Sequence, residues 1–219
     1  MTKKELVFLG PPASGKGTQT SRLSDHLGLP HVDTGSLLRK AIADGTEDGK
    51  IAKGFIEKGA LVPVNLVASI IKTRLKEEDC KNGFILDGFP RSVEQAEMLG
   101  LMLEEIDTEN DVDFKVIYFD IEQKLLIDRI IYRRSCPKCG KIYNLLSLKP
   151  QEDGVCDVCK TALTQRKDDT EEIAKSRFET YFRETAPLID YYEGKGALVK
   201  LDANGDVDKV WERLLAVVE

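Results

Sequence analysis

The sequence predicts an α/β fold of three layers, with helices covering both faces of a central parallel sheet of about five strands. Short apolar runs at 6–9, 84–87 and 114–120 are separated by segments whose apolar residues have helical spacing. Alternating strands and helices are typical of a parallel sheet, because each parallel crossover needs a long connection, usually a helix. With 219 residues, 42% of them hydrophobic, the chain can form the core of one large domain.

The first third of the chain is predicted to contain a small insertion between strands. The expected elements are a strand at 6–9, a helix ending at Gly28, a strand at 31–33, and helices at 37–43 and 51–58. Thr34 or Ser36 can cap the first of the two short helices. These helices are too small to form a core of their own, so we expect residues 33–62 to be an insertion.

The remaining two thirds continue the alternation and contain a second interruption. The expected elements are helices at 66–75 and 92–103, strands at 84–87 and 114–120, a helix at 123–134, a strand at 197–201 and a closing helix at 207–218. Asp169 and Glu172 have the spacing of a capping box for a long helix, in which Pro187 predicts a kink or break. Residues 132–169 lack helical periodicity and form the second predicted insertion.

A turn joins the first strand to the first helix, and its sequence is Gly10-Pro11-Pro12-Ala13-Ser14-Gly15-Lys16-Gly17-Thr18. Gly10 and Gly15 have the spacing of a phosphate-binding loop, and a lysine and a hydroxyl follow in the expected order. The N–H groups of the turn and of the helix N-terminus would surround an anion, and Lys16 would reach the β- and γ-phosphates. The turn therefore predicts binding of a nucleoside triphosphate.

Carboxylates follow two of the predicted strands, at Asp33 and Asp87, and Asp120 ends a third. Ligands of parallel sheets bind at the carboxyl ends of the strands, so we expect these residues and the phosphate loop to share one edge. Proteins with such a loop keep the carboxylate of their magnesium site at a strand end, and magnesium commonly retains the intervening waters. Asp87 is the expected magnesium carboxylate, acting through water. Asp33 competes for this role, and a purely structural strand-end aspartate is the alternative.

Seven arginines form a second candidate group in this chain of net charge −6: Arg39, Arg91, Arg129, Arg133, Arg134, Arg166 and Arg177. Arg129 and Arg133 are four residues apart in a segment predicted as one helix, so they would project from one face. Guanidinium groups suit bidentate phosphate binding, and phosphoryl transfer requires positive charge around the moving group. A single arginine is most often only a solvated surface charge, but several at the edges of the insertions favour a phosphate site.

Four of the five cysteines form two pairs, Cys136 with Cys139 and Cys156 with Cys159, and sixteen residues lie between the pairs. This spacing is typical of a four-cysteine zinc site folded as a hairpin. Four ligands leave no open coordination position, so the metal would be structural. Two disulfides or a cluster of free thiols are the alternatives. Cys80 stands alone and is expected to be a small, half-buried residue.

Composition argues against several classes of function. The net charge of −6 does not favour a nucleic-acid surface made by bulk charge. Residues 1–4 lead directly into the first strand, without an apolar stretch long enough for a signal peptide or a membrane span. We therefore expect a cytoplasmic protein that binds neither a membrane nor a nucleic acid.

Taken together, these motifs resemble the adenylate kinases of the long form with a zinc-binding lid, within the nucleoside monophosphate kinases that carry a phosphate-binding loop. The resemblance covers essentially the whole chain. Besides the loop, it rests on Asp-Thr-Gly-Ser-Leu-Leu-Arg at 33–39, Gly-Ala-Leu-Val-Pro at 59–63, Leu-Asp-Gly-Phe-Pro-Arg at 86–91 with Gln95, Asp-Arg at 128–129 and Arg-Lys-Asp-Asp at 166–169.

The resemblance implies an organisation into three parts. Residues 1–32, 63–131 and 170–219 would form the core, 33–62 the insertion that binds the monophosphate, and 132–169 the zinc-binding lid. The lid would close over the triphosphate, and the protein would be a monomer.

The resemblance also implies roles for individual residues. The expected ATP-binding residues are Ala13, Ser14, Gly15, Lys16, Gly17, Thr18, Arg129, Arg133, Ile142, Tyr143 and, through its backbone, Gly205. The expected AMP-binding residues are Thr34, Arg39, Ala60, Leu61, Val62, Gly88, Phe89, Pro90, Arg91, Gln95, Arg166 and Arg177. The expected catalytic residues are Lys16, Arg91, Arg129, Arg133, Arg166 and Arg177, with zinc on the four paired cysteines and magnesium on Asp87.

The implied reaction is reversible transfer of the γ-phosphoryl group of Mg-ATP to AMP, which gives two ADP. The AMP phosphate is already anionic near neutral pH, so no general base is needed. The sequence agrees, because its two histidines, His26 and His31, are not adjacent to the phosphate motifs. The alternatives are a UMP/CMP kinase, a GTP-dependent AMP kinase, a switch GTPase, or a zinc-ribbon protein that binds nucleic acid and carries a phosphate loop.

Ala13 departs from the family's pattern, which usually has glycine at this position. Glycine lets the backbone approach a phosphate without a Cβ. We expect alanine to be tolerated if its φ angle is negative, with an effect on nucleotide affinity or on the rigidity of the loop.

Overall fold

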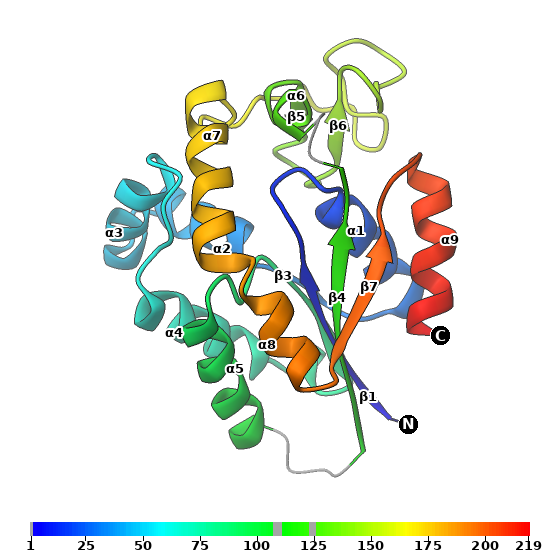
Figure 1. The fold of residues 1–219 in the computed structure, drawn as a ribbon. Coiled ribbons are helices and arrows are strands. Elements are labelled where there is room, and N and C mark those ends of the chain that lie inside the picture. The colour runs from blue at the N-terminus through cyan, green and yellow to red at the C-terminus, as the bar shows by residue number, and fades with distance from the viewer. Residues whose placement is uncertain (1, 107–110, 123–125) are drawn as a thin grey trace.

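The structure, a computed structural model, describes residues 2–106, 111–122 and 126–219. Over these residues, five strands form a parallel sheet in the order β2-β3-β1-β4-β7, and two further strands form a separate antiparallel pair (Figure 1). The strands of the main sheet are β1 (Lys3–Leu9), β2 (His31–Asp33), β3 (Gly83–Asp87), β4 (Val112–Asp120) and β7 (Leu198–Asp202). The predicted α/β fold with a parallel sheet is confirmed.

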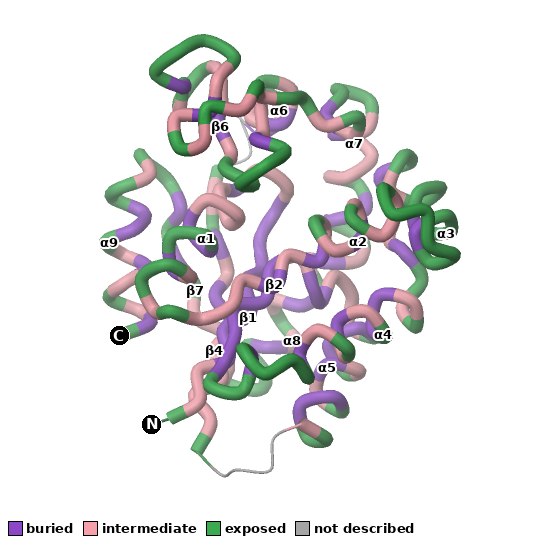
Figure 2. The backbone as a smooth tube through the Cα atoms, turned by 180° about the vertical axis from the view of Figure 1, so that it is seen from behind, coloured by how far each residue is buried: buried purple, intermediate pink, exposed green. Residues whose placement is uncertain are grey.

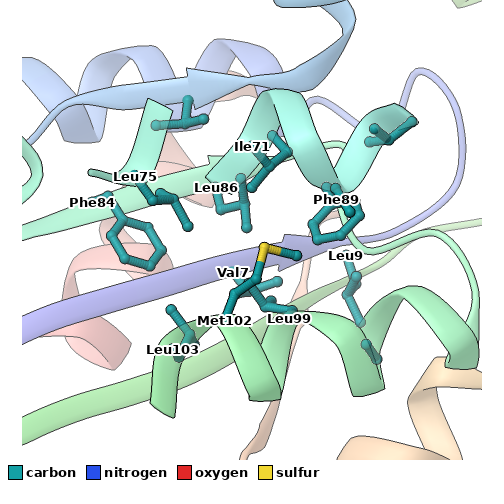
Figure 3. Packing of buried hydrophobic residues seen from close by; sticks show 14 of the residues in the cluster. Val7, Leu9, Ile71, Leu75, Phe84, Leu86, Phe89, Leu99, Met102 and Leu103 are labelled. Atoms are coloured by element: carbon teal, nitrogen blue, oxygen red, sulfur yellow. The ribbon is translucent and has the colours of Figure 1, made fainter. Parts of the chain in front are cut away.

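Side chains of β1 show why each face of the sheet has its own core. Successive side chains of a strand point to opposite faces, so Val7 and Leu9 enter one cluster while Leu6 and Phe8 enter another. The first cluster packs against α4 (Val64–Leu75), α5 (Val93–Ile106) and α8 (Leu188–Gly194), and Figure 3 shows its packing around Val7. The second packs against α1 (Lys16–Leu27) and α9 (Val207–Val218). The sheet is therefore the middle of three layers.

Two short helices follow β2: α2 (Thr34–Ala43) and α3 (Glu47–Ile56). Both begin earlier than their apolar spacing predicts, because a polar side chain caps each one. Asp33, rather than Thr34 or Ser36, caps α2 by accepting a hydrogen bond from the Gly35 N–H. Thr46 caps α3 in the same way at Gly49.

The helix predicted over 123–134 is shorter at its C-terminal end. Helix α6 spans Leu126–Ile131, and residues 123–125 lie outside the described residues. The chain then enters β5 (Arg133–Ser135), which pairs with β6 (Ile142–Asn144). Arg129 and Arg133 therefore do not share a helix face, and that prediction is wrong. The antiparallel pairing of β5 with β6 ends the helix, and no local sequence signal marks this.

The C-terminal helical region consists of α7 (Glu171–Thr180), a five-residue π-helix η3 (Tyr181–Thr185), and α8. Thr170 caps α7 by accepting from the Ile173 N–H, so the predicted capping box at Asp169 is wrong. The predicted interruption at Pro187 is confirmed, since Pro187 precedes α8 as its N-cap. A short 3₁₀ helix, η1 (Glu78–Cys80), precedes β3, and Cys80 is buried rather than half-buried.

The arrangement of layers places the site at the carboxyl ends of the strands. Residues 132–169 lie beyond these ends, and α2 and α3 lie to one side (Figure 1). Figure 2 shows that buried residues are concentrated in the strands and that many residues of α3 and around β6 are exposed. Across the described ranges, no helix is long and apolar enough to cross a membrane.

Candidate active site

The phosphate loop lies between β1 and α1, as its sequence predicts. Gly10 and Gly15 have positive φ angles of 146° and 97°, in regions of backbone conformation that favour glycine. A Cβ at Gly10 would lie 3.0 Å from the Cβ of Phe119 on β4, so close packing also favours glycine at this position. Lys16 Nζ folds back over the loop and donates to the carbonyl oxygens of Gly10 and Pro11 at 2.7 and 3.0 Å. It also donates to Ser14 Oγ at 3.1 Å.

The charge of Lys16 is held in an unfavourable environment. Burial, together with the nearby guanidinium groups of Arg91, Arg177 and Arg133, lowers the pKa of Lys16 to about 8, although Asp87 acts to raise it. An anion bound next to Lys16 would therefore stabilise the charged form of its side chain. The geometry and the charge together suit binding of a polyphosphate.

A cleft of about 380 Å³ opens above the loop at the carboxyl ends of the strands. Every residue expected to bind ATP lines it: Ala13, Ser14, Gly15, Lys16, Gly17, Thr18, Arg129, Arg133, Ile142, Tyr143 and Gly205. Asp87, Pro90 and Arg166 line it as well. The cleft therefore brings together segments from the phosphate loop, from β6 and from the loop before α9.

A second, smaller cavity of about 70 Å³ lies beside the first, between α2 and the segment 59–62. Thr34, Ala60, Val62 and Gln95 line only this cavity, and Arg39, Leu61, Gly88, Arg91 and Arg177 line both. Phe89 is the exception among the expected AMP-binding residues, because its side chain is fully buried in the core (Figure 3). Only its backbone could face a ligand.

Arg91 lies at the junction of the two cavities, where hydrogen bonds from its backbone and from its side chain fix its position. Its N–H donates to Gln95 Oε1 at 2.8 Å, and its Nε donates to the Gly88 carbonyl at 2.7 Å. Burial lowers the pKa of Arg91 and lowers the pKa of both Arg166 and Arg177 to about 10. Arg91 and Arg177 line both cavities, and Arg166 lines the larger one.

Carboxylates pair with several of the cleft arginines. Asp169 is fully buried and accepts from Arg133 Nε at 2.9 Å and from Arg133 Nη2. Arg177 Nη1 lies 3.4 Å from Asp168 Oδ2. Sequence reasoning did not find these partners, because Asp169 also fits a helix-capping pattern. The sequence signal that could have identified these partners is the pair Asp168-Asp169, which directly follows Arg166 and Lys167.

Asp33 and Asp87 differ in what surrounds them. Asp33 accepts from the Gly35 N–H and the Ser36 hydroxyl and lies 3.4 Å from Arg39 Nη2. Although burial acts to raise the pKa of Asp33, Arg39 and the Ser36 hydrogen bond lower it overall. Both carboxylates line the large cleft, but only Asp87 is close enough to Lys16 to influence its pKa, whereas Asp33 is already paired with Arg39. Asp87 is thus the better placed of the two carboxylates for a metal bound with the triphosphate.

Three further residues lie differently from what the sequence predicts. His31 is close to the phosphate site after all, because its Nε2 lies 3.7 Å from Asp87 Oδ2. Arg134 donates to the carbonyl oxygens of Ile131 and Arg133 instead of lining the cleft. Asp120 ends β4 at the expected edge but is exposed and is not among the described residues that line the cleft.

Comparison with known proteins decides between the kinase and its rivals. A family model described as "Adenylate kinase" matches residues 8–197. A protein named adenylate kinase from Archaeoglobus fulgidus is 46% identical over 214 residues, which cover 98% of this chain and 97% of the relative. The adenylate kinase of Thermotoga maritima is 45% identical over 97% of this chain and 96% of its own, and that of Methanosarcina mazei is 45% identical over 97% of both.

The chain belongs to the adenylate kinase family.

In this adenylate kinase family member, the four paired cysteines converge beyond the cleft. Their sulfur atoms all lie within 4.8 Å of one another, a spacing that could hold a metal ion. The Tyr143 hydroxyl donates to Cys156 Sγ at 3.5 Å, which lowers the pKa of Cys156 to about 6. A thiolate is the form that binds metal, so the donor chemistry fits a metal site. Tyr143 also lines the cleft and thus connects the cysteine group to the nucleotide side.

Ala13 has a φ angle of 62°, so the condition under which alanine is expected to be tolerated, a negative φ angle, is not met. The loop must turn through the left-handed region here, and the usual family glycine does so without strain. A residue with a Cβ loses about 1–2 kcal/mol in this conformation. This adenylate kinase family member therefore carries backbone strain within its phosphate loop.

Replacing Ala13 with glycine should stabilise the protein. Relief of left-handed strain is worth about 1–2 kcal/mol, and the extra freedom of glycine in the unfolded chain costs about 0.4–1 kcal/mol. We expect a net gain of about 0.5–1 kcal/mol in the free energy of unfolding, measured by urea denaturation. The matched control is Ala43→Gly at the end of helix α2, which should lower stability. A loss of stability in both variants would contradict the strain at Ala13.

Proposed function

We propose that this protein catalyses reversible transfer of the γ-phosphoryl group of Mg-ATP to AMP, giving two ADP. One observation carries the proposal: two cavities, one of them on the phosphate loop, meet at Arg39, Gly88, Arg91 and Arg177. A switch GTPase or a nucleic-acid-binding protein has no use for a second phosphate site beside the first. In this assignment, 33–62 is the monophosphate insertion, 132–169 is the lid and the remaining residues form the core.

The chemistry follows from the charges around the junction. An anionic oxygen of the AMP phosphate attacks the γ-phosphorus, and the bond to the β–γ bridging oxygen breaks, leaving ADP on each side. No side chain needs to remove a proton, since the nucleophile is already ionised. Lys16 and the arginines at the junction align the two substrates and balance the charge on the moving phosphoryl group. Closure of the lid excludes water, which would otherwise compete with AMP.

Magnesium enters this scheme as the companion of ATP, and it would neutralise charge on the phosphates. Asp87 offers the oxygen ligand that magnesium prefers, at the cleft edge of β3 and close to Lys16. Thr20 Oγ1 lies 3.4 Å from Asp87 Oδ2 and helps to orient the carboxylate. The residues present therefore fit a magnesium ion held by Asp87 through water. We further propose that the active unit is a monomer, as the resemblance of the motifs implies.

The first prediction tests the reaction and its substrates. The protein should convert ATP and AMP to ADP in a coupled assay, with AMP strongly preferred over UMP, CMP and GMP, and ATP preferred over GTP. Lys16→Ala should lower kcat/KM by about 10²–10³-fold, the usual cost of removing one group that stabilises a developing oxyanion. A preference for UMP or CMP, or for GTP, would establish the corresponding alternative kinase. ATP hydrolysis without transfer to any monophosphate would contradict the proposal.

The second prediction concerns pH and follows from Lys16. Its pKa of about 8 in the free protein means that the cation is lost as pH rises through 8. We therefore expect kcat/KM for ATP to fall above about pH 8, while kcat holds to higher pH because bound phosphates favour the charged lysine. The control is Lys16→Arg, which stays charged and should lose the step near pH 8 whatever its residual activity. A step that persists in Lys16→Arg would assign it to another group.

The third prediction concerns the cysteine group, which we propose binds structural zinc. The four thiol ligands suit a tetrahedral zinc ion, and a reducing, cytoplasmic environment would keep them unoxidised. Metal analysis should find about one zinc per chain, and a chelator should lower the melting temperature while activity persists at low temperature. Cys80→Ser is the control, since Cys80 lies outside the cluster and should leave the zinc content unchanged. A metal-free protein, or zinc content unchanged in Cys156→Ser, would contradict the proposal.

A further inference from the structure

Helix α7 contacts the insertion 33–62 at a point that the sequence does not indicate. Ser176 Oγ donates a hydrogen bond of 2.7 Å to the carbonyl oxygen of Lys58, which is 118 positions away in the chain. The neighbouring Gly59 is buried, and a Cβ there would lie 3.1 Å from both Ser176 Oγ and Arg177 Cγ. The backbone of the insertion thus rests closely on α7 at this point.

Helix α7 is a firm support for this contact because both of its ends are anchored. Thr170 caps its N-terminus. The π-helix η3 at its other end carries Thr185, which is buried and donates to the Arg91 carbonyl at 2.7 Å. Arg177, next to Ser176, is held by Asp168. A segment that binds to α7 is therefore positioned relative to Arg91 and Arg177, the arginines shared by the two cavities.

The segment held by Ser176 leads directly into the smaller cavity. Gly59, Ala60, Leu61 and Val62 line one side of it, and Arg177 lines another. The Gly59 and Ala60 N–H groups bond to the carbonyls of Ile56 and Phe55, so these bonds fix the segment only to α3 within the same insertion. The Ser176 bond instead links the segment to a different part of the molecule.

We propose that Ser176 is a positioning residue for the monophosphate site: it docks the insertion onto α7 through the Lys58 carbonyl and so sets the shape of the smaller cavity. The inference rests on the proposed function only for the identity of the ligand, AMP. It assigns no contact between Ser176 and substrate. The triphosphate side of the cleft, which is lined by the phosphate loop and β6, does not depend on this bond.

The expected consequence is a selective change in affinity for AMP. Loss of one neutral hydrogen bond corresponds to about a two- to tenfold change in an equilibrium constant. Ser176→Ala should therefore raise KM and Kd for AMP about two- to tenfold, with KM for ATP unchanged and kcat within about twofold. Alanine forms helix better than serine, so α7 and the melting temperature should be preserved.

The experiment compares three variants with the unaltered protein. Ser176→Ala removes the hydroxyl, Ser176→Thr retains it, and Ser21→Ala removes an exposed hydroxyl on α1 as the matched control. KM is measured for each substrate at saturating concentration of the other, and AMP binding is measured by calorimetry. Ser176→Thr should restore most of the AMP affinity, and Ser21→Ala should behave like the unaltered protein.

A readout independent of activity separates this inference from the proposed function. Amide hydrogen exchange at residues 59–62 of the ligand-free protein should be faster in Ser176→Ala than in Ser176→Thr. Equal exchange in the two, or equal rises in KM for AMP and ATP, would overturn the positioning role. Absence of phosphoryl transfer in the unaltered protein would instead overturn the proposed function and leave the exchange result to decide the role of Ser176.

Discussion

Lys16 and several arginines of the cleft lie close together; burial lowers the pKa of Lys16, Arg166 and Arg177, and repulsion by neighbouring guanidinium groups adds to this effect. Repulsion of this kind destabilises the folded protein unless anions balance it, because burial removes the solvent that would screen the charges. The concentration of positive charge is what phosphoryl transfer requires. In the ligand-free protein, other groups of the site must balance this positive charge.

Carboxylates from separate parts of the chain provide the balance. Asp33 ends β2, Asp87 ends β3, and Asp168 and Asp169 precede α7. Asp33 pairs with Arg39, Asp168 with Arg177 and Asp169 with Arg133. Asp169 is fully buried, so its pair with Arg133 matters most for stability, because removing Arg133 would leave a buried charge without compensation. The acids also orient the guanidinium groups, so that a bound phosphate meets donors already in place.

Local patterns in the sequence predicted much of this protein. The apolar run Leu6-Val7-Phe8-Leu9, the glycine spacing of the phosphate loop and the two cysteine pairs each depend on neighbours within a few residues. Such patterns act through backbone geometry and side-chain direction, which are decided locally. The sheet, the helices around it, the loop at the end of β1 and the convergence of the cysteines therefore agree with the sequence reading.

Tertiary structure alone decided features that depend on residues distant in the chain. Asp169 fits a helix cap by its spacing, yet it pairs with Arg133, because the β5–β6 pairing ends helix α6 early and brings that arginine back across the cleft. Ala13 also shows the limit of local patterns, because the residues on either side of it do not predict its positive φ angle. The sequence by itself determined which chemical groups are available and on which elements they lie. Which of these groups pair with one another is decided only by the folded structure, because folding brings together residues that long stretches of chain separate.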